Sequence, residues 1–220
     1  MTRKLQAGRK APQSGTTRSA ILFLHGYGAD GADLLGLADP LGPHLPDTVF
    51  VAPNAPERCS GNPFGYQWFP IPWLDGSSEQ AASEGMAQAA RDLDAFIDDT
   101  LDAEGLGPDQ LGVIGFSQGT MMALHVLPRR AAPVAGLAGF SGRLLAPELL
   151  AAEVVSRPPV LLVHGDSDEM VPPSSMPEAA QALRGAGFDV RTHVSEGTGH
   201  GIAPDGLGVA LQFLRAVLPG

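Results

Sequence analysis

The chain has 220 residues, 44% hydrophobic and 17% charged, which fits a folded domain with a buried core and excludes a disordered chain. Its formal net charge of −10 repels phosphate backbones and acidic lipids, so nucleic-acid binding is disfavoured. The single cysteine, Cys59, excludes an intramolecular disulfide and a thiolate metal cluster. No apolar run could span a bilayer and no signal-peptide core follows the basic N-terminus, so we expect a cytoplasmic protein without stable membrane insertion.

Short apolar runs separated by Gly, Pro and Asp turns predict buried strands. In chain order, the clear strand predictions are residues 20–24, 48–51, 111–115 and 160–163, with weaker ones at 134–140 and 188–194. Runs that are apolar almost throughout are typical of a parallel sheet that is covered on both faces.

Helical periodicity lies between these strands. The clearest helix is predicted to begin at Ser77, where Ser77-Ser78-Glu79-Gln80 has the spacing of a capping box, and to end at Gly105. Further helices are predicted at residues 119–127, 147–155, 177–184 and 206–218. The alternation predicts one doubly wound α/β domain over residues 1–220, with residues 1–17 either poorly ordered or an edge strand.

A serine in a glycine-flanked turn is the first candidate for chemistry. Gly115-Phe116-Ser117-Gln118-Gly119 directly follows an apolar strand and directly precedes a helix-like segment, residues 120–127. A sharp turn from strand to helix strains the serine backbone and exposes its hydroxyl, and it requires small residues two positions before and after. This context favours a nucleophile elbow over an incidental serine, so we predict Ser117 as the nucleophile.

A nucleophilic serine needs a general base, and in folds with this elbow the base follows the serine in the chain. His200 lies in a flexible turn, Gly197-Thr198-Gly199-His200-Gly201, between a predicted strand and the last helix. The other downstream histidines lie in a helix or in strands, where structural roles are more common: His125, His164 and His193. We therefore predict His200 as the base.

The base needs an anion to orient it, and the loop after strand 160–163 carries Asp166, Asp168 and Glu169. Acidic residues in turns commonly bind nearby amides, so at least two of the three are expected to have no catalytic role. Asp168 lies further into the loop, where the chain can approach His200. Spacing alone gives Asp168 only a small advantage over Asp166.

Two backbone N–H groups are needed to stabilise the charge that develops on the attacked carbonyl oxygen. We expect one from Gln118 and the other from Tyr27, in the glycine-rich loop of residues 25–31. That loop also has the dinucleotide spacing Gly26-x-Gly28-x-x-Gly31, but no acidic residue follows the next predicted strand, which leads into Ala52-Pro53-Asn54. Nucleotide binding is therefore the weaker interpretation.

Four motifs occur in a fixed order: His25-Gly26, Gly115-Phe116-Ser117-Gln118-Gly119, His164-Gly165-x-x-Asp168-x-x-Val171-Pro172 and Gly199-His200-Gly201. With them, residues 18–218 resemble the phospholipase/carboxylesterase family, which includes the acyl-protein thioesterases. The resemblance implies a single-domain α/β-hydrolase fold with a mostly parallel sheet, helices on both faces and no large cap domain. It implies a triad of Ser117, Asp168 and His200, with the amides of Tyr27 and Gln118 as oxyanion donors. Family members often carry leucine at the position of Tyr27, so this side chain is expected to alter the acyl site.

A long irregular segment, residues 53–76, is rich in Pro and Gly and holds both tryptophans. Loops of this length inside a compact domain are usually functional. We expect Trp68, Phe69 and Trp73 to form an apolar wall for an acyl chain or alcohol, unless the aromatic side chains pack onto the loop's own core. Met121 and Met122 are expected in the core.

These features predict a serine carboxylesterase that hydrolyses short- to medium-chain carboxylic esters through an acyl-enzyme. A thioesterase or lysophospholipase with the same triad is the nearest alternative, and a non-catalytic binding protein on this fold is a second class. We expect a small-molecule ester as the binding partner, with no cofactor and no metal ion. The sequence leaves a homodimer open.

Overall fold

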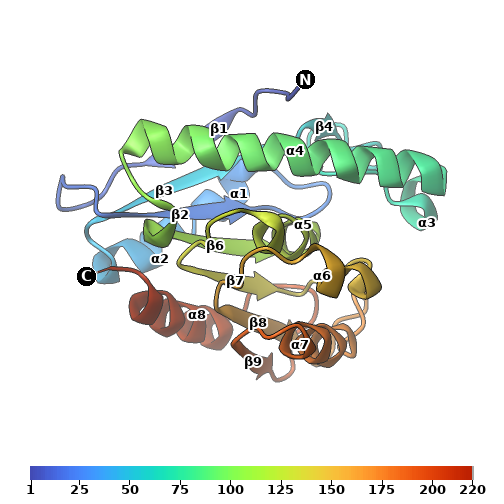
Figure 1. The fold of residues 1–220 in the computed structure, drawn as a ribbon. Helices are drawn as coiled ribbons and strands as arrows, with labels where there is room; N and C mark the ends of the chain where they lie inside the picture. The colour runs from blue at the N-terminus through green and yellow to red at the C-terminus, as the bar shows by residue number, and fades with distance from the viewer. Residues whose placement is uncertain (220) are drawn as a thin grey trace.

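A seven-stranded, mostly parallel β-sheet forms the centre of the molecule (Figure 1). The computed structural model describes residues 1–219 of the chain. The strand order is β1-β3-β2-β6-β7-β8-β9; β1 pairs with β3 in antiparallel orientation and the other neighbours are parallel. The strands are β1 (Ala7–Lys10), β2 (Ser19–Leu24), β3 (Thr48–Pro53), β6 (Leu111–Phe116), β7 (Gly136–Phe140), β8 (Val160–Gly165) and β9 (Val190–Ser195). A separate two-stranded hairpin pairs β4 (Glu57–Arg58) with β5 (Tyr66–Gln67).

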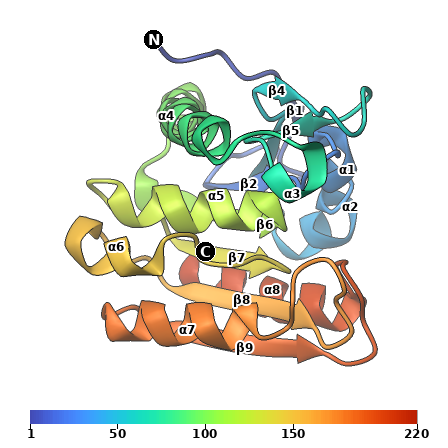
Figure 2. The same ribbon diagram turned by 90° about the vertical axis from the view of Figure 1, so that its right-hand side faces the viewer.

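Helices cover both faces of the sheet, as Figure 2 shows. One face packs against α1 (Gly31–Leu35), α2 (Ala38–Leu41) and α8 (Pro204–Val217). The other packs against α4 (Glu79–Glu104), α5 (Gln118–Val126), α6 (Pro147–Glu153) and α7 (Ser175–Gly185). The short helix α3 (Pro72–Asp75) precedes α4. The central strands are buried along their length except at Phe116, the last residue of β6, which explains why their sequences are apolar almost throughout.

The predicted single-domain α/β architecture is confirmed, and each predicted strand and helix overlaps an observed one. The first serine of the predicted capping box is not the cap. Ser78 is the N-cap of α4 and accepts a hydrogen bond from the Ala81 N–H, whereas the Ser77 N–H donates to Asp75. α4 ends at Gly105 in the left-handed conformation, as predicted.

The topology places several loops at one edge of the sheet. From β2 the chain moves outward to β3 on one side, and from β6 it moves outward to β7, β8 and β9 on the other. Ligands of doubly wound sheets bind at the carboxyl ends of the strands, at such a change of direction. The loops that follow β2, β6, β8 and β9 carry the predicted triad and oxyanion residues, while Trp68, Phe69 and Trp73 follow β5. Among residues 1–219, no helix is both long and apolar enough to cross a membrane.

Candidate active site

Ser117 lies at a sharp turn between β6 and α5. Its backbone has φ 52° and ψ −117°, a strained conformation for a residue other than glycine. The turn is pinned to β7, because the Phe140 carbonyl accepts hydrogen bonds from the Ser117 N–H at 2.8 Å and from the Thr120 hydroxyl at 2.9 Å. A β-carbon on Gly119 would lie 1.9 Å from the Leu24 carbonyl oxygen, so only glycine fits there.

The structure brings the three residues Ser117, His200 and Asp168 into one hydrogen-bonded chain. The Ser117 Oγ lies 2.9 Å from His200 Nε2, and His200 Nδ1 lies 2.8 Å from Asp168 Oδ2. The Asp168 carboxylate can only accept a hydrogen bond, so His200 Nδ1 carries the proton and donates to it. Nε2 is then free to accept the proton of the serine hydroxyl. The ring of Phe116 packs against the imidazole, with the ring centroids 4.9 Å apart. This arrangement can activate a serine hydroxyl for attack on a carbonyl.

Asp168 is buried but has several donors. Its Oδ1 accepts from the N–H groups of Met170 and Val171, both at 2.9 Å, while Oδ2 faces His200. Burial alone would raise the pKa of Asp168, but the hydrogen bonds from His200, Val171 and Met170 outweigh it and lower the pKa below its ordinary value. The carboxylate is therefore charged at neutral pH.

His164 also contacts this carboxylate, a contact that the sequence reasoning did not anticipate. Its Nε2 lies 3.2 Å from Asp168 Oδ2 and 3.0 Å from the Val171 carbonyl oxygen, and the imidazole is buried. Two acceptors at one nitrogen place the proton on Nε2. The spacing of four residues between His164 and Asp168 around a strand end was the available signal.

The alternative acid, Asp166, has a different role in the structure. Its Oδ1 accepts from the Gly197 N–H at 2.8 Å and from the Ser167 hydroxyl at 2.9 Å, and so ties the loop after β8 to the loop after β9. Among the remaining histidines, His193 pairs with Asp205 at 2.8 Å on the surface. His125 lies in α5, where burial lowers its pKa. The geometry thus separates the candidates that sequence spacing could not.

The N–H groups of Tyr27 and Gln118 donate to no protein acceptor within residues 1–219. Gln118 is the first residue of α5, whose N–H has no partner inside the helix. The loop that carries Tyr27 passes close to Ser117, since a β-carbon on Gly26 would lie 3.2 Å from Ser117 Cβ. Both amides are therefore free, next to the serine, to bind an oxyanion.

The Gln118 side chain fixes the aromatic segment against this turn. Its Oε1 accepts from the Trp68 N–H at 2.9 Å and its Nε2 donates to the Phe69 carbonyl at 2.8 Å. The Trp68 indole N–H donates to the His25 carbonyl at 2.9 Å, and the indole is fully buried. A fully buried side chain offers no surface to a substrate, so the structure does not bring Trp68 to a binding surface.

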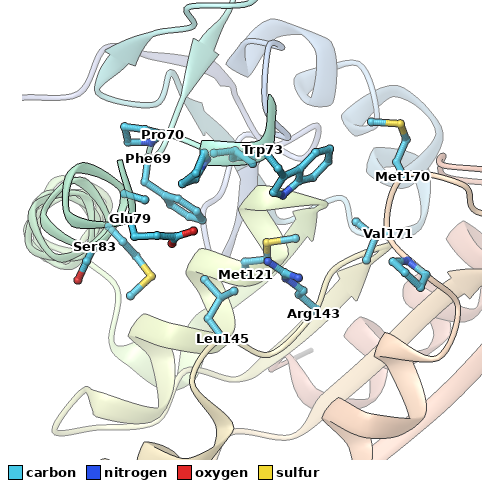
Figure 3. Close-up of a pocket in the computed structure, with 15 residues that line it drawn as sticks. Phe69, Pro70, Trp73, Glu79, Ser83, Met121, Arg143, Leu145, Met170 and Val171 are labelled. Atoms are coloured by element: carbon cyan, nitrogen blue, oxygen red, sulfur yellow. The ribbon is translucent and has the colours of Figure 1, made fainter. Parts of the chain in front are cut away.

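Figure 3 shows an apolar groove of about 300 Å³, which is lined by residues of α3, α4 and α5 and of the loops after β5, β7 and β8. Phe69 and Trp73 line it. Met121 lines it too, although Met121 and Met122 both lie in the hydrophobic core, as the sequence predicted. The groove does not include Ser117 itself. Two of its lining residues are neighbours of the triad: the Met121 N–H donates to the Ser117 carbonyl at 3.1 Å, and the Val171 N–H donates to Asp168 at 2.9 Å.

The Tyr27 side chain does not line this groove. Its hydroxyl lies 3.2 Å from the Ser60 hydroxyl, and burial together with the nearby Cys59 thiol raises the pKa of the phenol. The sequence predicted that the Tyr27 side chain would alter the acyl site. The side chain does not contribute to the wall of this groove. Within residues 1–219, no three His, Cys, Asp or Glu side chains gather in a way that could hold a metal ion.

Known proteins resemble this chain over nearly its whole length. The model of the family described as Phospholipase/Carboxylesterase matches residues 10–218. The crystal structure of esterase PE8 superposes with a TM-score of 0.93 at 46% identity, covering 98% of this chain and all of that one. Esterase YpfH of Escherichia coli is 27% identical over 90% of this chain and 83% of its own. Acyl-protein thioesterase 1 of Saccharomyces cerevisiae is 28% identical over 96% of this chain and 97% of its own.

Proposed function

This chain belongs to the phospholipase/carboxylesterase family of α/β-hydrolases, and from that premise we propose that it is a serine carboxylesterase acting on short- to medium-chain esters. Ser117 is the nucleophile, His200 the general base and Asp168 the residue that orients it. The observation that carries the proposal is the chain of contacts from Ser117 Oγ to His200 Nε2 at 2.9 Å and from His200 Nδ1 to Asp168 at 2.8 Å.

The reaction follows from the donor and acceptor at each atom. His200 Nε2 takes the proton from Ser117 Oγ as the oxygen attacks the ester carbonyl, and the charged Asp168 stabilises the imidazolium that forms. The carbonyl oxygen becomes negative and accepts hydrogen bonds from the N–H groups of Tyr27 and Gln118. His200 then protonates the departing alkoxide, leaving an acyl group on Ser117. Water, activated by the same imidazole, releases the acid.

The apolar groove is the proposed acyl site. Phe69, Trp73 and Met121 line it, and its volume of about 300 Å³ is at the small end for a ligand pocket. A groove of this size suits an acyl chain of short to medium length. Trp73 is 66% exposed and stands at the surface, so the groove is open on that side.

Labelling with a fluorophosphonate tests the assignment of the nucleophile. Wild type should be labelled at Ser117, and Ser117→Ala should lose both the label and hydrolysis of 4-nitrophenyl butyrate, by roughly 10⁴-fold or more in kcat. Ser167→Ala is the matched control, because this serine lies in the loop after β8 and its hydroxyl bonds only Asp166. Labelling of the Ser117→Ala variant at another serine would disprove the assignment.

A thioesterase is the second candidate, since the same residues could attack an acyl thioester and relatives carry that name. Comparing kcat/KM for 4-nitrophenyl esters and for acyl thioesters of two to twelve acyl carbons (about the range that the groove could hold) separates the two. Oxygen esters of short to medium length are expected to give the higher values. A higher kcat/KM for long-chain thioesters would favour the alternative.

A further inference from the structure

One positive charge faces the apolar groove without a partner. Arg143 lines the groove that also contains Phe69 and Met121, and it forms no ion pair or hydrogen bond within residues 1–219. Most other arginines of the described chain are engaged: Arg3, Arg9, Arg18, Arg129 and Arg130 in ion pairs, and Arg157 and Arg184 with backbone carbonyls. Figure 3 shows the guanidinium of Arg143 directed into the groove.

The backbone that carries Arg143 is held firmly against the nucleophile. Ser141 has φ 48°, a strained conformation, and its N–H donates to the Val163 carbonyl at 2.9 Å. Gly142 packs so closely that a β-carbon there would lie 3.1 Å from the Ser117 carbonyl oxygen and 2.5 Å from Thr120. Strain that persists at a site is commonly tied to its function. The turn that positions Ser117 thus also fixes the backbone at Arg143, and the exposed Arg143 side chain extends from it along the groove.

The charges of the groove are divided between its walls. Glu79, the first residue of α4, lines the wall opposite Arg143 (Figure 3). An anion beside Glu79 would be repelled, whereas a guanidinium can bind a carboxylate through two parallel hydrogen bonds. A negative group in this groove therefore has one favourable position, beside Arg143.

We propose that Arg143 binds an anionic group at the far end of the acyl chain, so that the enzyme prefers half-esters of dicarboxylic acids over neutral esters of the same length. This inference rests on the proposed function, which places the acyl chain in the groove. It names the substrate class within that function: an apolar acyl chain that ends in a carboxylate.

The test compares two esters that differ only at the far end, by one charge and one methyl group. The half-ester 4-nitrophenyl hydrogen adipate carries a free carboxylate, and its methyl ester is neutral; both release the same chromophore. Adipates are chosen because shorter dicarboxylic half-esters expel nitrophenolate unaided through cyclic anhydrides. For wild type we expect kcat/KM for the acid to exceed that for its methyl ester, and Arg143→Gln to lower this ratio by roughly tenfold.

The control variant is Arg91→Gln, which removes one positive charge from α4 outside the groove and should leave the ratio unchanged. Arg143→Lys should retain part of the preference. A ratio in Arg143→Gln within twofold of wild type overturns the inference. Normal hydrolysis of the neutral ester in that case leaves the esterase proposal intact, so the two failures are distinguishable.

A binding measurement keeps the inference testable if neither ester is hydrolysed. Adipate is titrated into the Ser117→Ala variant and into the Ser117→Ala, Arg143→Gln double variant by isothermal calorimetry, with hexanoate as the neutral-ended comparison. Adipate should bind the single variant more tightly than hexanoate does, and this advantage should vanish in the double variant. Equal binding of adipate by both variants overturns the inference.

Discussion

Asp168 illustrates how the neighbours of one residue set its charge state, which its proposed role requires. Each of its carboxylate oxygens accepts hydrogen bonds, from Met170 and Val171 on one side and from His200 on the other. These donors outweigh the cost of burial and lower the pKa of the carboxyl. The charged form is therefore favoured by the folded state and adds to its stability.

The lowered pKa of Asp168 predicts a pH-dependent contribution to folding. The ordinary pKa is 3.8, so the stabilisation is fully present above about pH 4 and is lost as pH falls through the lower folded-state value. Asp168→Asn should lower the free energy of unfolding by about 1–3 kcal/mol at pH 7. Urea unfolding measured from pH 7 to pH 3 should show this difference shrinking below pH 4. A difference that grows as pH falls would contradict the prediction.

At the scale of elements, the turn between β6 and α5 depends on two close approaches. The first turn of α5 packs against the end of β2, where a β-carbon on Gly119 would meet the Leu24 carbonyl oxygen. The loop that carries Tyr27 begins immediately after β2. The distance between the proposed nucleophile and the proposed oxyanion donor is therefore set by how closely α5 and β2 pack.

Gly119→Ala should consequently damage both stability and activity. The added methyl group must push α5 away from β2, at a cost of about 3 kcal/mol in the free energy of unfolding. The resulting misplacement of the oxyanion donors should lower kcat by roughly 100-fold in the fraction that remains folded. Chemical denaturation and ester hydrolysis measure the two effects.

Gly185→Ala is the matched control, because Gly185 ends α7 and a β-carbon there has no neighbour within 4 Å. This variant should keep full activity and gain up to about 1 kcal/mol in stability, since alanine favours helix more than glycine does. Equal losses in both variants would mean that close packing at Gly119 is not the cause.

The elements that the sequence predicted are those with a strong local signal. Continuous apolar runs predicted β2, β3, β6 and β8, and the capping and periodicity predicted α4. The short elements β1, α1 and α3 have no apolar period of sufficient length. Their conformation is fixed by contacts with distant segments, as when β1 pairs with β3.

At the scale of the whole molecule, the N-terminal segment ties α4 to the rest of the domain. Asp92, fully buried in α4, accepts from the Arg3 N–H and from Arg3 Nε, both at 2.7 Å, and from the Gln88 amide at 2.9 Å. Arg3 also pairs with Glu57, in the hairpin formed by β4 and β5. The first turn of α4 lines the groove, so this network links the chain terminus to the proposed acyl site.

Removing this buried carboxylate should weaken the whole domain. Asp92→Ala leaves the backbone N–H and the Nε of Arg3 without their acceptor, while the pair with Glu57 remains. We expect the free energy of unfolding to fall by about 1–3 kcal/mol, nearer the lower value because Arg3 is partly exposed to water. Asp99→Ala is the control, as Asp99 is an exposed residue of the same helix. Urea denaturation of both variants checks the prediction, and equal midpoints would contradict it.

The sequence predicted the residues of the candidate site because a nucleophile elbow restricts which residue types can occur around the serine and the order in which its partners follow. Ser117 and His200 followed from the residues alone, while the choice of Asp168 over Asp166 required the family resemblance. The sequence could not predict contacts that depend on the direction of a side chain. Examples are the complete burial of Trp68 and the contribution of Met121 to the groove. Hydrophobic periodicity in the sequence predicts which face of a helix or strand is buried, but it does not identify the element that packs against that face.

The position of β9 affects how the enzyme loses activity. This strand is at the edge of the sheet and pairs only with β8, and its middle residues are partly or fully exposed. The loop that contains His200 connects β9 to α8. Edge segments open more easily than central strands, and their amides exchange hydrogen faster. We therefore expect brief local opening at β9 to move the His200 imidazole away from Ser117 while β2, β6 and the loops that follow them stay folded. Activity should then be lost before the whole domain unfolds.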